Sequence, residues 1–368
     1  MLFLSIIALF IWTFIFLAPY HPWSTKESFE PSKTLFPQDE KIDVLIPARN
    51  EEDCIGKLLT DLKHQNCLNK IIIIDDQSSD LTADIARSSG LRNLLLVNGT
   101  EPPNDWTGKV WALEQGLKYV TEDHVILLDA DISLKENTID SLLEKLKNEN
   151  LTLLSIMATL KMKSLWDYML IPTFIYFFKL LYPFALVNNP KSKVAAAAGG
   201  VILLKTKAIR NIGGFSSIKN VLIDDCNLAK KIKNSGGTTW LGLSKAIRTR
   251  RPYYHLKHIW NMVARTAFSQ LKYSPLLLLL CTKCMITLYL APILGLFSSS
   301  IPIVVFSSIT IILMMWTFIP TLKYYQINLA WSVLLPVNAT LFLLMTWTSA
   351  CRYWNGEKSK WKDRTYNK

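Results

Sequence analysis

A short apolar run that ends in two carboxylates constrains this chain more than any other feature. Residues 125–128 read Val-Ile-Leu-Leu and are followed by Asp129, Ala130 and Asp131. An unbroken apolar run of this length predicts a strand buried on both faces of a parallel sheet, with its carboxyl end facing the crevice where α/β sheets bind ligands. Carboxylates this close repel each other unless a cation lies between them, and a divalent ion bound to substrate phosphates would relieve that repulsion. The alternative is a simple strand end followed by a helix cap, and this D-x-D pattern alone leaves both interpretations open.

Earlier segments repeat the pattern of a buried strand followed by a helix. These strands are predicted at residues 42–47, 70–74 and 94–97. Strands that alternate with helices at this spacing predict a parallel, doubly wound sheet. Because Asp75 and Asp76 end one strand as Asp129 and Asp131 follow another, we expect all four acids at one edge of that sheet.

Both ends of the chain are apolar. Residues 1–18 lack a basic leading segment and a small-residue cleavage site, which favours an uncleaved transmembrane anchor over a signal peptide. Residues 19–40 contain several prolines and mixed charge and are predicted to be a linker. Apolar stretches at 276–298, 301–320 and 329–350 predict a C-terminal transmembrane region over 276–350.

The basic tail, residues 351–368, indicates how the chain is oriented. From Arg352 onward it carries six Lys or Arg residues against two acids. The positive-inside tendency predicts that this tail and the catalytic domain both lie in the cytoplasm of a multi-pass protein of the cell membrane. Three complete spans would place the tail outside, so two to three spans are predicted, and residues 276–298 are the candidate for a re-entrant or interfacial segment.

Composition excludes some function classes. The net charge of +12 would suit a nucleic-acid partner, but the middle of the chain has no basic stripe with interleaved aromatics. A membrane protein with basic cytoplasmic flanks explains the charge, so no nucleic acid is expected. The six cysteines are scattered and predict neither disulfides nor a metal cluster.

The ordered set of motifs resembles family 2 glycosyltransferases of the GT-A fold over residues 41–270. The matching segments are 46–52, 74–80, 108–109, 129–131, 199–200, 213–215 and 224–225. Residues 106–111, 222–226 and 264–275 look like the hopanoid-biosynthesis-associated branch of that family. The expected fold class is therefore α/β, a GT-A nucleotide-sugar-binding domain flanked by N-terminal and C-terminal transmembrane helices.

The resemblance implies a nucleotide-diphosphate sugar donor and a divalent cation, Mg²⁺ or Mn²⁺. Asp131 would coordinate the metal, together with Asp129, which would also lie near the ribose and the donor sugar. The expected donor-binding residues are Pro47, Ala48, Asn50, Glu51, Asp76, Lys109, Asp129 and Arg265. The chemistry of Lys109 supports its place independently, because a leaving nucleoside diphosphate gains negative charge that an ammonium and a divalent cation stabilise. A solvated lysine near a helix start is the alternative.

On the acceptor side the resemblance implies Gly199, Gly200 and Asp224, with Asp225 as the general base. Asp225 would deprotonate the acceptor hydroxyl as it attacks the anomeric carbon from the face opposite the diphosphate, which inverts the configuration. Two acids at a helix start also serve as simple caps. Processive members of the family carry Gln-x-x-Arg-Trp around the position of Arg265; Met262 and Thr266 replace the Gln and Trp here, which favours a single transfer.

Residues 164–187 form an aromatic-rich block. It holds Asp167 and Lys179 as its charges and is expected to be interrupted at Pro172 and Pro183. It is either core or an interfacial helix at which an acceptor lipid enters, and we favour the interfacial helix.

These inferences predict a membrane-bound inverting glycosyltransferase that moves one sugar to a lipid or isoprenoid acceptor, hopanoid by resemblance. Two alternatives stay open: a processive polysaccharide synthase, and a membrane protein that binds nucleotide sugar without turnover.

Overall fold

The computed structural model describes residues 1–32, 40–357, 360–361 and 364–365. The chain divides into two compact units. The helical unit comprises Met1–Lys26, Met162–Ala185 and Tyr253–Lys358, and the sheet unit comprises Glu27–Lys161, Leu186–Pro252 and Ser359–Lys368.

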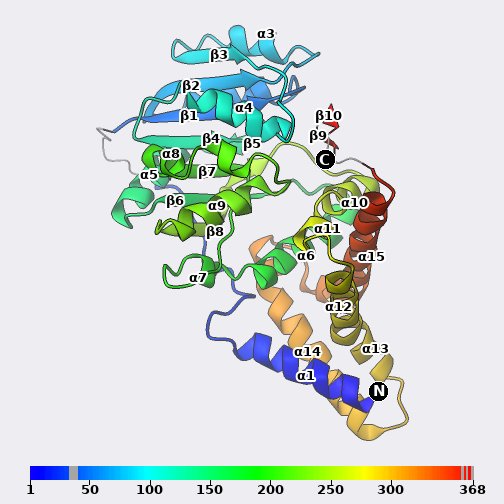
Figure 1. Ribbon diagram of the computed structural model, residues 1–368. Helices are drawn as coiled ribbons and strands as arrows, with labels where there is room; N and C mark the ends of the chain where they lie inside the picture. Colours follow the sequence, from blue (N-terminus) through cyan, green and yellow to red (C-terminus); the bar gives the residue numbers. More distant parts are fainter. Residues whose placement is uncertain (33–39, 358–359, 362–363, 366–368) are drawn as a thin grey trace. The chain divides into compact units, whose positions relative to one another are not determined.

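The sheet unit alternates strands and helices (Figure 1). Its strands are β1 (Ile42–Ala48), β2 (Leu68–Asp75), β3 (Leu94–Asn98), β4 (His124–Leu128), β5 (Ile132–Leu134), β6 (Leu153–Thr159), β7 (Val201–Lys205), β8 (Thr239–Thr249), β9 (Lys360–Trp361) and β10 (Arg364–Thr365). Its helices are α2 (Ile55–Leu62), α3 (Thr82–Arg87), α4 (Gly108–Leu117), α5 (Thr138–Asn148), α8 (Thr206–Asn211), the 3₁₀ turn η1 (Phe215–Ile218) and α9 (Asp224–Asn234), with α7 (Phe184–Val187) where the chain passes between the units.

The first eight strands form one mixed sheet in the order β3-β2-β1-β4-β7-β6-β8-β5. Strands β3, β2, β1 and β4 are parallel, as the sequence predicts. The sheet as a whole is mixed, because β7 runs antiparallel to both β4 and β6, and β5 runs antiparallel to β8. The amino-terminal part of the sheet follows the βαβ rule, whereas β7 returns beside β4 in the opposite direction.

Helices cover both faces of this sheet. Alternate residues of β1 point to opposite faces, so Val44 and Ile46 join one apolar core while Leu45 joins the other. The first core is closed by apolar residues of α2 and α5, and the second by those of α4, η1 and α9. Every residue of β1 is buried, as expected for a central strand with a helical layer on each face.

The helical unit contains α1 (Leu2–Leu17), α6 (Leu165–Leu181), α10 (Leu256–Ala264), α11 (Ala267–Gln270), α12 (Pro275–Met285), the π turn η2 (Ile286–Leu290), α13 (Ala291–Gly295), α14 (Ile301–Tyr324), the 3₁₀ turn η3 (Leu329–Leu334) and α15 (Leu335–Trp354). In the part of the chain that the structure describes, three helical stretches are long and apolar enough to cross a membrane: Pro275–Gly295, Ile301–Tyr324 and Leu329–Trp354. The apolar helix α1 is shorter.

Helix α6 packs inside the helical unit. The hydroxyl of Tyr176 lies 2.8 Å from that of Thr317 on α14, and Asn338 of α15 donates to the hydroxyl of Thr173 at 2.8 Å. The helix continues through Pro172, where an interruption was expected. Residues 162–185 and 253–270, which the sequence assigns to the catalytic domain, thus belong to the helical unit, while the interfacial position of the 164–187 block stays a prediction.

Other predicted boundaries fall partly outside the described residues. Within the predicted linker 19–40, Phe29 donates its backbone N–H to Leu243 of β8 at 2.8 Å, and residues 33–39 are not described. In the predicted tail 351–368, α15 extends to Trp354 and residues 360–361 pair antiparallel with 364–365. The remaining tail residues from 358 on are outside the described part of the chain.

Helix α1 offers a matched test of packing in the helical unit. Trp12 is fully buried and donates its indole N–H to the carbonyl of Leu288 at 3.0 Å, whereas Phe10 on the same helix is 72% exposed. Trp12→Ala removes a large buried ring and a hydrogen bond. We therefore expect it to lower the free energy of unfolding of the detergent-purified protein by roughly 3–5 kcal/mol, measured as a lower melting temperature. Phe10→Ala should change stability little; equal effects of the two variants would contradict this packing.

Candidate active site

The carboxyl ends of three parallel strands bring the predicted donor residues to one edge of the sheet. Strand β1 lies between β2 and β4 and is parallel to both. The segments that leave β1, β2 and β4 therefore start at the same edge, which places Asp76 beside Ala48 and Asp129 beyond Leu128. The backbone N–H of Asp76 donates to the carbonyl of Ala48 at 2.8 Å, which joins the two strand ends directly.

Backbone hydrogen bonds fix the turn that carries Asp129 and Asp131. Asp129 donates its N–H to the carbonyl of Gly200 at 3.1 Å, and Ile132 donates to the carbonyl of Asp129 at 3.1 Å. The carbonyl of Asp131 accepts from the N–H of Arg250 at 2.7 Å. The turn is thereby tied both to the chain entering β7 and to the chain leaving β8.

Lys109 occupies the centre of an acidic cluster. It is the second residue of α4, and its Nζ lies 2.7 Å from Oδ1 of Asp129 and 3.7 Å from Oδ2 of Asp224. Burial alone lowers the pKa of the Lys109 ammonium, but the surrounding carboxylates, Asp129 foremost, outweigh burial and raise that pKa above its ordinary value. Lys109 therefore stays charged, and the solvated alternative does not describe it.

The carboxyl of Asp225 in this cluster has a raised pKa. Burial, followed by repulsion from Asp224, raises its pKa from 3.8 to about 6, although Lys109 and the N–H of Cys226 counteract the rise. That N–H donates to Oδ1 of Asp225 at 2.7 Å, so one carboxylate oxygen is held at the start of α9. A carboxyl with a pKa near 6 is ionised at neutral pH and is a better proton acceptor than an ordinary aspartate.

Acidic, basic and apolar side chains line one pocket around this cluster. The predicted site residues that line it are Pro47, Lys109, Asp129, Gly199, Asp224 and Asp225. Apolar residues not predicted as site residues complete the lining, among them Leu113, Phe215, Ile218 and Leu228. Phe215 belongs to the matching segment 213–215, whereas Leu113, Ile218 and Leu228 take their positions from the packing of α4, η1 and α9 and are marked by none of the matching motifs.

The absence of a side chain at Gly199 keeps the cluster open. A Cβ at this position would lie 3.2 Å from both Oδ2 of Asp225 and Nζ of Lys109. We expect Gly199→Ala to displace these groups and lower turnover about tenfold or more, since small misplacements of catalytic groups are costly. The measurement is kcat beside the melting temperature, with Ala198→Gly as the control; unchanged kcat in Gly199→Ala would contradict the tight approach.

The predicted nucleoside-side residues form a second group after β1 and β2. Asn50 has a positive φ of 51°, and its side chain accepts from the N–H of Ser79 at 2.9 Å. Glu51 is buried and donates its backbone N–H to the hydroxyl oxygen of Thr82 at 2.7 Å. Its carboxylate pairs with Arg251. These hydrogen bonds join the loop after β1 to the segment after β2.

The predicted donor residue Arg265 belongs to the helical unit. It caps the C-terminus of α10 in the helical unit, where its N–H donates to the carbonyl of Asn261 at 3.1 Å. Asp61 was not predicted as a site residue. Arg250 and Arg251 lie in a basic run, residues 248–251, for which the sequence favours a solvated surface over a contact with diphosphate or anionic headgroups. Arg250 and Asp61 are 189 positions apart, so no spacing rule connects them.

The acids fit a hard divalent cation in charge and ligand type. Asp129, Asp224 and Asp225 surround a single ammonium, which leaves net negative charge for a further cation to balance. Among the described residues no three or more His, Cys, Asp or Glu side chains are grouped so that they could hold a metal ion, so these side chains alone supply no metal-binding cage. Such a cage is unnecessary for Mg²⁺ or Mn²⁺, which bind through one or two carboxylates, water and substrate phosphates.

The mixed sheet between helical layers, with acids beyond β2 and β4, defines an α/β protein of the GT-A class. Residues 43–213, somewhat less than half of the chain, match the sequence model of glycosyl transferase family 2, so this stretch is similar to that family. The fold is also that of a solved mannosyltransferase, PcManGT from Pyrobaculum calidifontis in complex with GDP-Man and Mn²⁺. The two share 16% identity with a TM-score of 0.56 over 96% of this chain and 99% of that one.

Curated relatives match a shorter stretch. A 4,4'-diaponeurosporenoate glycosyltransferase of Staphylococcus haemolyticus (strain JCSC1435) is 38% identical over 106 residues, 28% of each chain. The protein of the same name from Staphylococcus aureus (strain USA300) is 33% identical over 115 residues, 31% of this chain and 30% of that one. The matched stretch spans less than a third of these relatives, and neither name refers to hopanoids, so the hopanoid branch stays a prediction.

Proposed function

We propose that this protein is a membrane-bound inverting glycosyltransferase that transfers one sugar from a nucleotide-diphosphate sugar to a lipid acceptor of the isoprenoid class. The observation that carries the proposal is the cluster in which Lys109 lies between Asp129 and Asp224, with Asp225 at a raised pKa, on a domain similar to glycosyl transferase family 2. A cation and a base side by side are the two functions that this reaction needs.

The donor would bind across the carboxyl ends of β1, β2 and β4. Pro47, Ala48, Asn50, Glu51 and Asp76 would surround the nucleoside. Lys109 would neutralise the diphosphate, which gains negative charge as the bond to the anomeric carbon breaks. Asp129 and Asp131 would hold a divalent cation, which supplies further charge stabilisation at the diphosphate when bound. We also propose that Arg265 contacts the diphosphate.

Transfer would proceed as a single displacement. The acceptor hydroxyl approaches past Gly199, Gly200 and Asp224, and its oxygen forms a bond to the anomeric carbon as the bond to the diphosphate oxygen breaks. The hydroxyl proton passes to the carboxylate of Asp225. Attack opposite the leaving group inverts the anomeric configuration, and the product is one glycoside and one nucleoside diphosphate.

The isoprenoid class of acceptor rests on two kinds of support. Two curated relatives carry names that refer to diaponeurosporenoate, an isoprenoid-derived compound, and three helical stretches are apolar enough to cross a membrane. Exposed apolar residues along α1, including Phe3, Phe10 and Phe14, are suited to contact with lipid. A hopanoid acceptor belongs to the same class and is the more specific form of the proposal. The sheet unit would lie on the cytoplasmic face of the cell membrane.

A donor and acceptor screen tests the proposal. Detergent-purified protein is incubated with UDP- and GDP-sugars, Mn²⁺ or Mg²⁺, and hopanoid or carotenoid-type acceptors, and nucleoside diphosphate release is measured. We expect release that requires both the metal and an isoprenoid acceptor, with an inverted anomeric centre in the product. Donor binding without release under every acceptor would contradict the proposal and favour a non-catalytic binding protein, and long glycan products would favour a processive synthase.

A further inference from the structure

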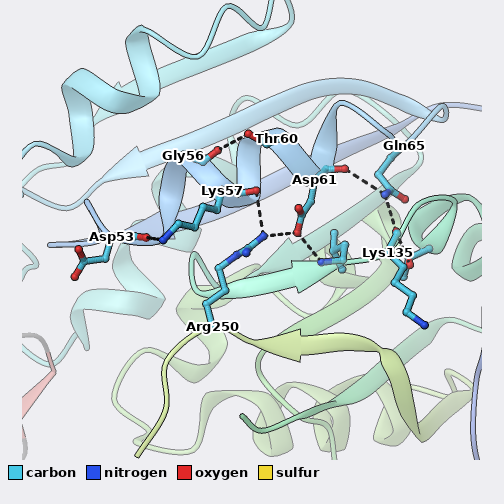
Figure 2. Close-up of polar contacts among 10 residues, drawn as sticks. Asp53, Gly56, Lys57, Thr60, Asp61, Gln65, Lys135 and Arg250 are labelled. Carbon is cyan, nitrogen blue, oxygen red and sulfur yellow. Dashed lines mark hydrogen bonds and ion pairs between the residues drawn. The ribbon is translucent and has the colours of Figure 1, made fainter.

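An ion pair outside the acidic cluster joins α2 to the end of β8. One guanidinium NH₂ group of Arg250 lies 2.5 Å from Oδ2 of Asp61 and also donates to the carbonyl of Lys57 at 3.2 Å, as Figure 2 shows. Both paired side chains are about one-fifth exposed, at 21% and 20%. A partly buried pair of this kind is screened by salt less than an exposed pair.

The carboxylate of Asp61 has a second partner. The same Oδ2 atom accepts the backbone N–H of Leu134, at the end of β5, at 2.9 Å. Strand β5 begins directly after Asp131 and pairs antiparallel with β8, with Ile132 opposite Thr249. A single carboxylate on α2 thus holds both strands of the ribbon that follows the D-x-D turn.

Arg250 reaches the turn through its backbone as well. Its N–H donates to the carbonyl of Asp131 at 2.7 Å, while its side chain is held by Asp61. The position of the Asp131 main chain therefore depends on where α2 holds Arg250. The connection runs from Asp61 through Arg250 to Asp131.

The next residue extends the connection to the nucleoside side. The guanidinium of Arg251 pairs with the carboxylate of Glu51, which is buried just ahead of α2. Burial lowers the pKa of Arg251, but the Glu51 carboxylate outweighs burial and raises that pKa, so the guanidinium stays charged. Consecutive arginines are thus anchored to the segment 51–61, one to each end.

We propose that Asp61 and Arg250 are positioning residues for donor binding: their ion pair fixes the main chain of Asp131 and directs Arg251 to Glu51. The inference rests on the proposed function, in which Asp131 holds the cation and Glu51 lines the nucleoside pocket. Neither Asp61 nor Arg250 touches the reacting atoms in this role. Loss of the pair should loosen the cation site before it affects the fold, because β5 and β8 keep their backbone pairing.

The test measures Mn²⁺ binding rather than turnover. Binding of Mn²⁺ is followed by electron paramagnetic resonance, alone and with UDP or GDP, in the full-length protein in detergent. We expect Asp61→Asn and Arg250→Gln each to weaken Mn²⁺ binding in the presence of the nucleotide about tenfold, with melting temperatures near that of the wild type. The double variant should be no weaker than either single variant, since both remove one interaction.

Matched variants separate positioning from a general effect of charge. Asp84 and Arg87 form an exposed ion pair on α3, with Nη1 and Oδ1 2.9 Å apart, and Asp84→Asn and Arg87→Gln should bind Mn²⁺ like the wild type. Arg250→Lys keeps a cation beside Asp61 without the planar fork and should lose less affinity than Arg250→Gln. If Asp61→Asn does not fold, the comparison of Arg250→Lys with Arg250→Gln still tests whether the ion pair positions the cation site.

The outcomes distinguish this inference from the function on which it rests. If the wild type binds Mn²⁺ more tightly with UDP or GDP and both pair variants behave identically to it, the positioning role is overturned while the proposed function stands. If neither nucleotide strengthens Mn²⁺ binding to the wild type, the proposed function itself is overturned. Weaker binding in the pair variants, with the Asp84 and Arg87 variants unaffected, supports the inference.

Discussion

Asp225→Asn should remove nearly all turnover while leaving donor binding largely intact. The amide keeps the shape of the side chain but cannot accept the proton of an acceptor hydroxyl, so we expect turnover to fall by about 10³-fold. Metal-dependent binding of the nucleoside diphosphate should change far less, because Asp129, Asp131 and Lys109 carry it in our proposal. The measurements are product formation and nucleotide affinity on the same preparation.

The same substitution should stabilise the fold at neutral pH. The pKa of Asp225 is raised from 3.8 to about 6 in the folded state. Protonated Asp225 therefore contributes to the free energy of unfolding in full below pH 3.8, and this contribution is lost as the pH rises through 6. At pH 7.5 the ionised carboxylate destabilises the folded state, on the order of 1–3 kcal/mol after allowance for partial exposure. We therefore expect Asp225→Asn to melt at a higher temperature than the wild type at pH 7.5, with a smaller difference at pH 5.

A control and a contradictory outcome accompany this prediction. Asp53→Asn, at an exposed position in the loop before α2, should alter neither turnover nor melting temperature. Near-normal turnover in Asp225→Asn would rule out its role as base. It would also indicate an acceptor whose attacking oxygen is already an anion and needs no deprotonation.

Lys109→Met should lower turnover almost as much as Asp225→Asn, because it removes a positive charge from the site. It removes the ammonium that lies 2.7 Å from Asp129 and leaves adjacent carboxylates without their central cation. Loss of one preorganised group that stabilises developing charge costs about 10²–10³ in kcat, and we expect a decrease in this range. Lys118→Met, at an exposed position at the end of the same helix, should leave kcat unchanged.

The pH dependence of Lys109→Met provides an independent test. In the wild type, kcat/KM should rise with pH through about 6 as Asp225 ionises. Lys109 lowers the pKa of Asp225, so its removal should move this rise to higher pH. A residual activity whose rise stays at the wild-type pH would show that Lys109 does not act on Asp225.

Local patterns in the sequence predicted much of the sheet unit. The apolar runs of β1, β2, β3 and β4 alternate with helices, and this pattern requires parallel neighbours whose carboxyl ends share an edge. That rule is enough to predict Asp76 and Asp129 at that edge without knowledge of any contact. It fails for β7, whose apolar sequence 201–204 indicates a strand but not its direction. The direction of β7 depends on its pairing with β4 and β6, which are distant in the chain.

The sequence by itself determined the buried strands, the acids that follow them and the apolar lengths of the C-terminal helices, because each depends on residues adjacent in the chain. The tertiary structure alone decided that Lys109 lies between Asp129 and Asp224, and that Asp61 binds Arg250 across 189 positions. These contacts join residues from different strands and helices, so they arise only when both layers pack on the sheet. The raised pKa of Asp225 has the same origin, since burial and the charges of neighbouring acids exist only in the folded chain.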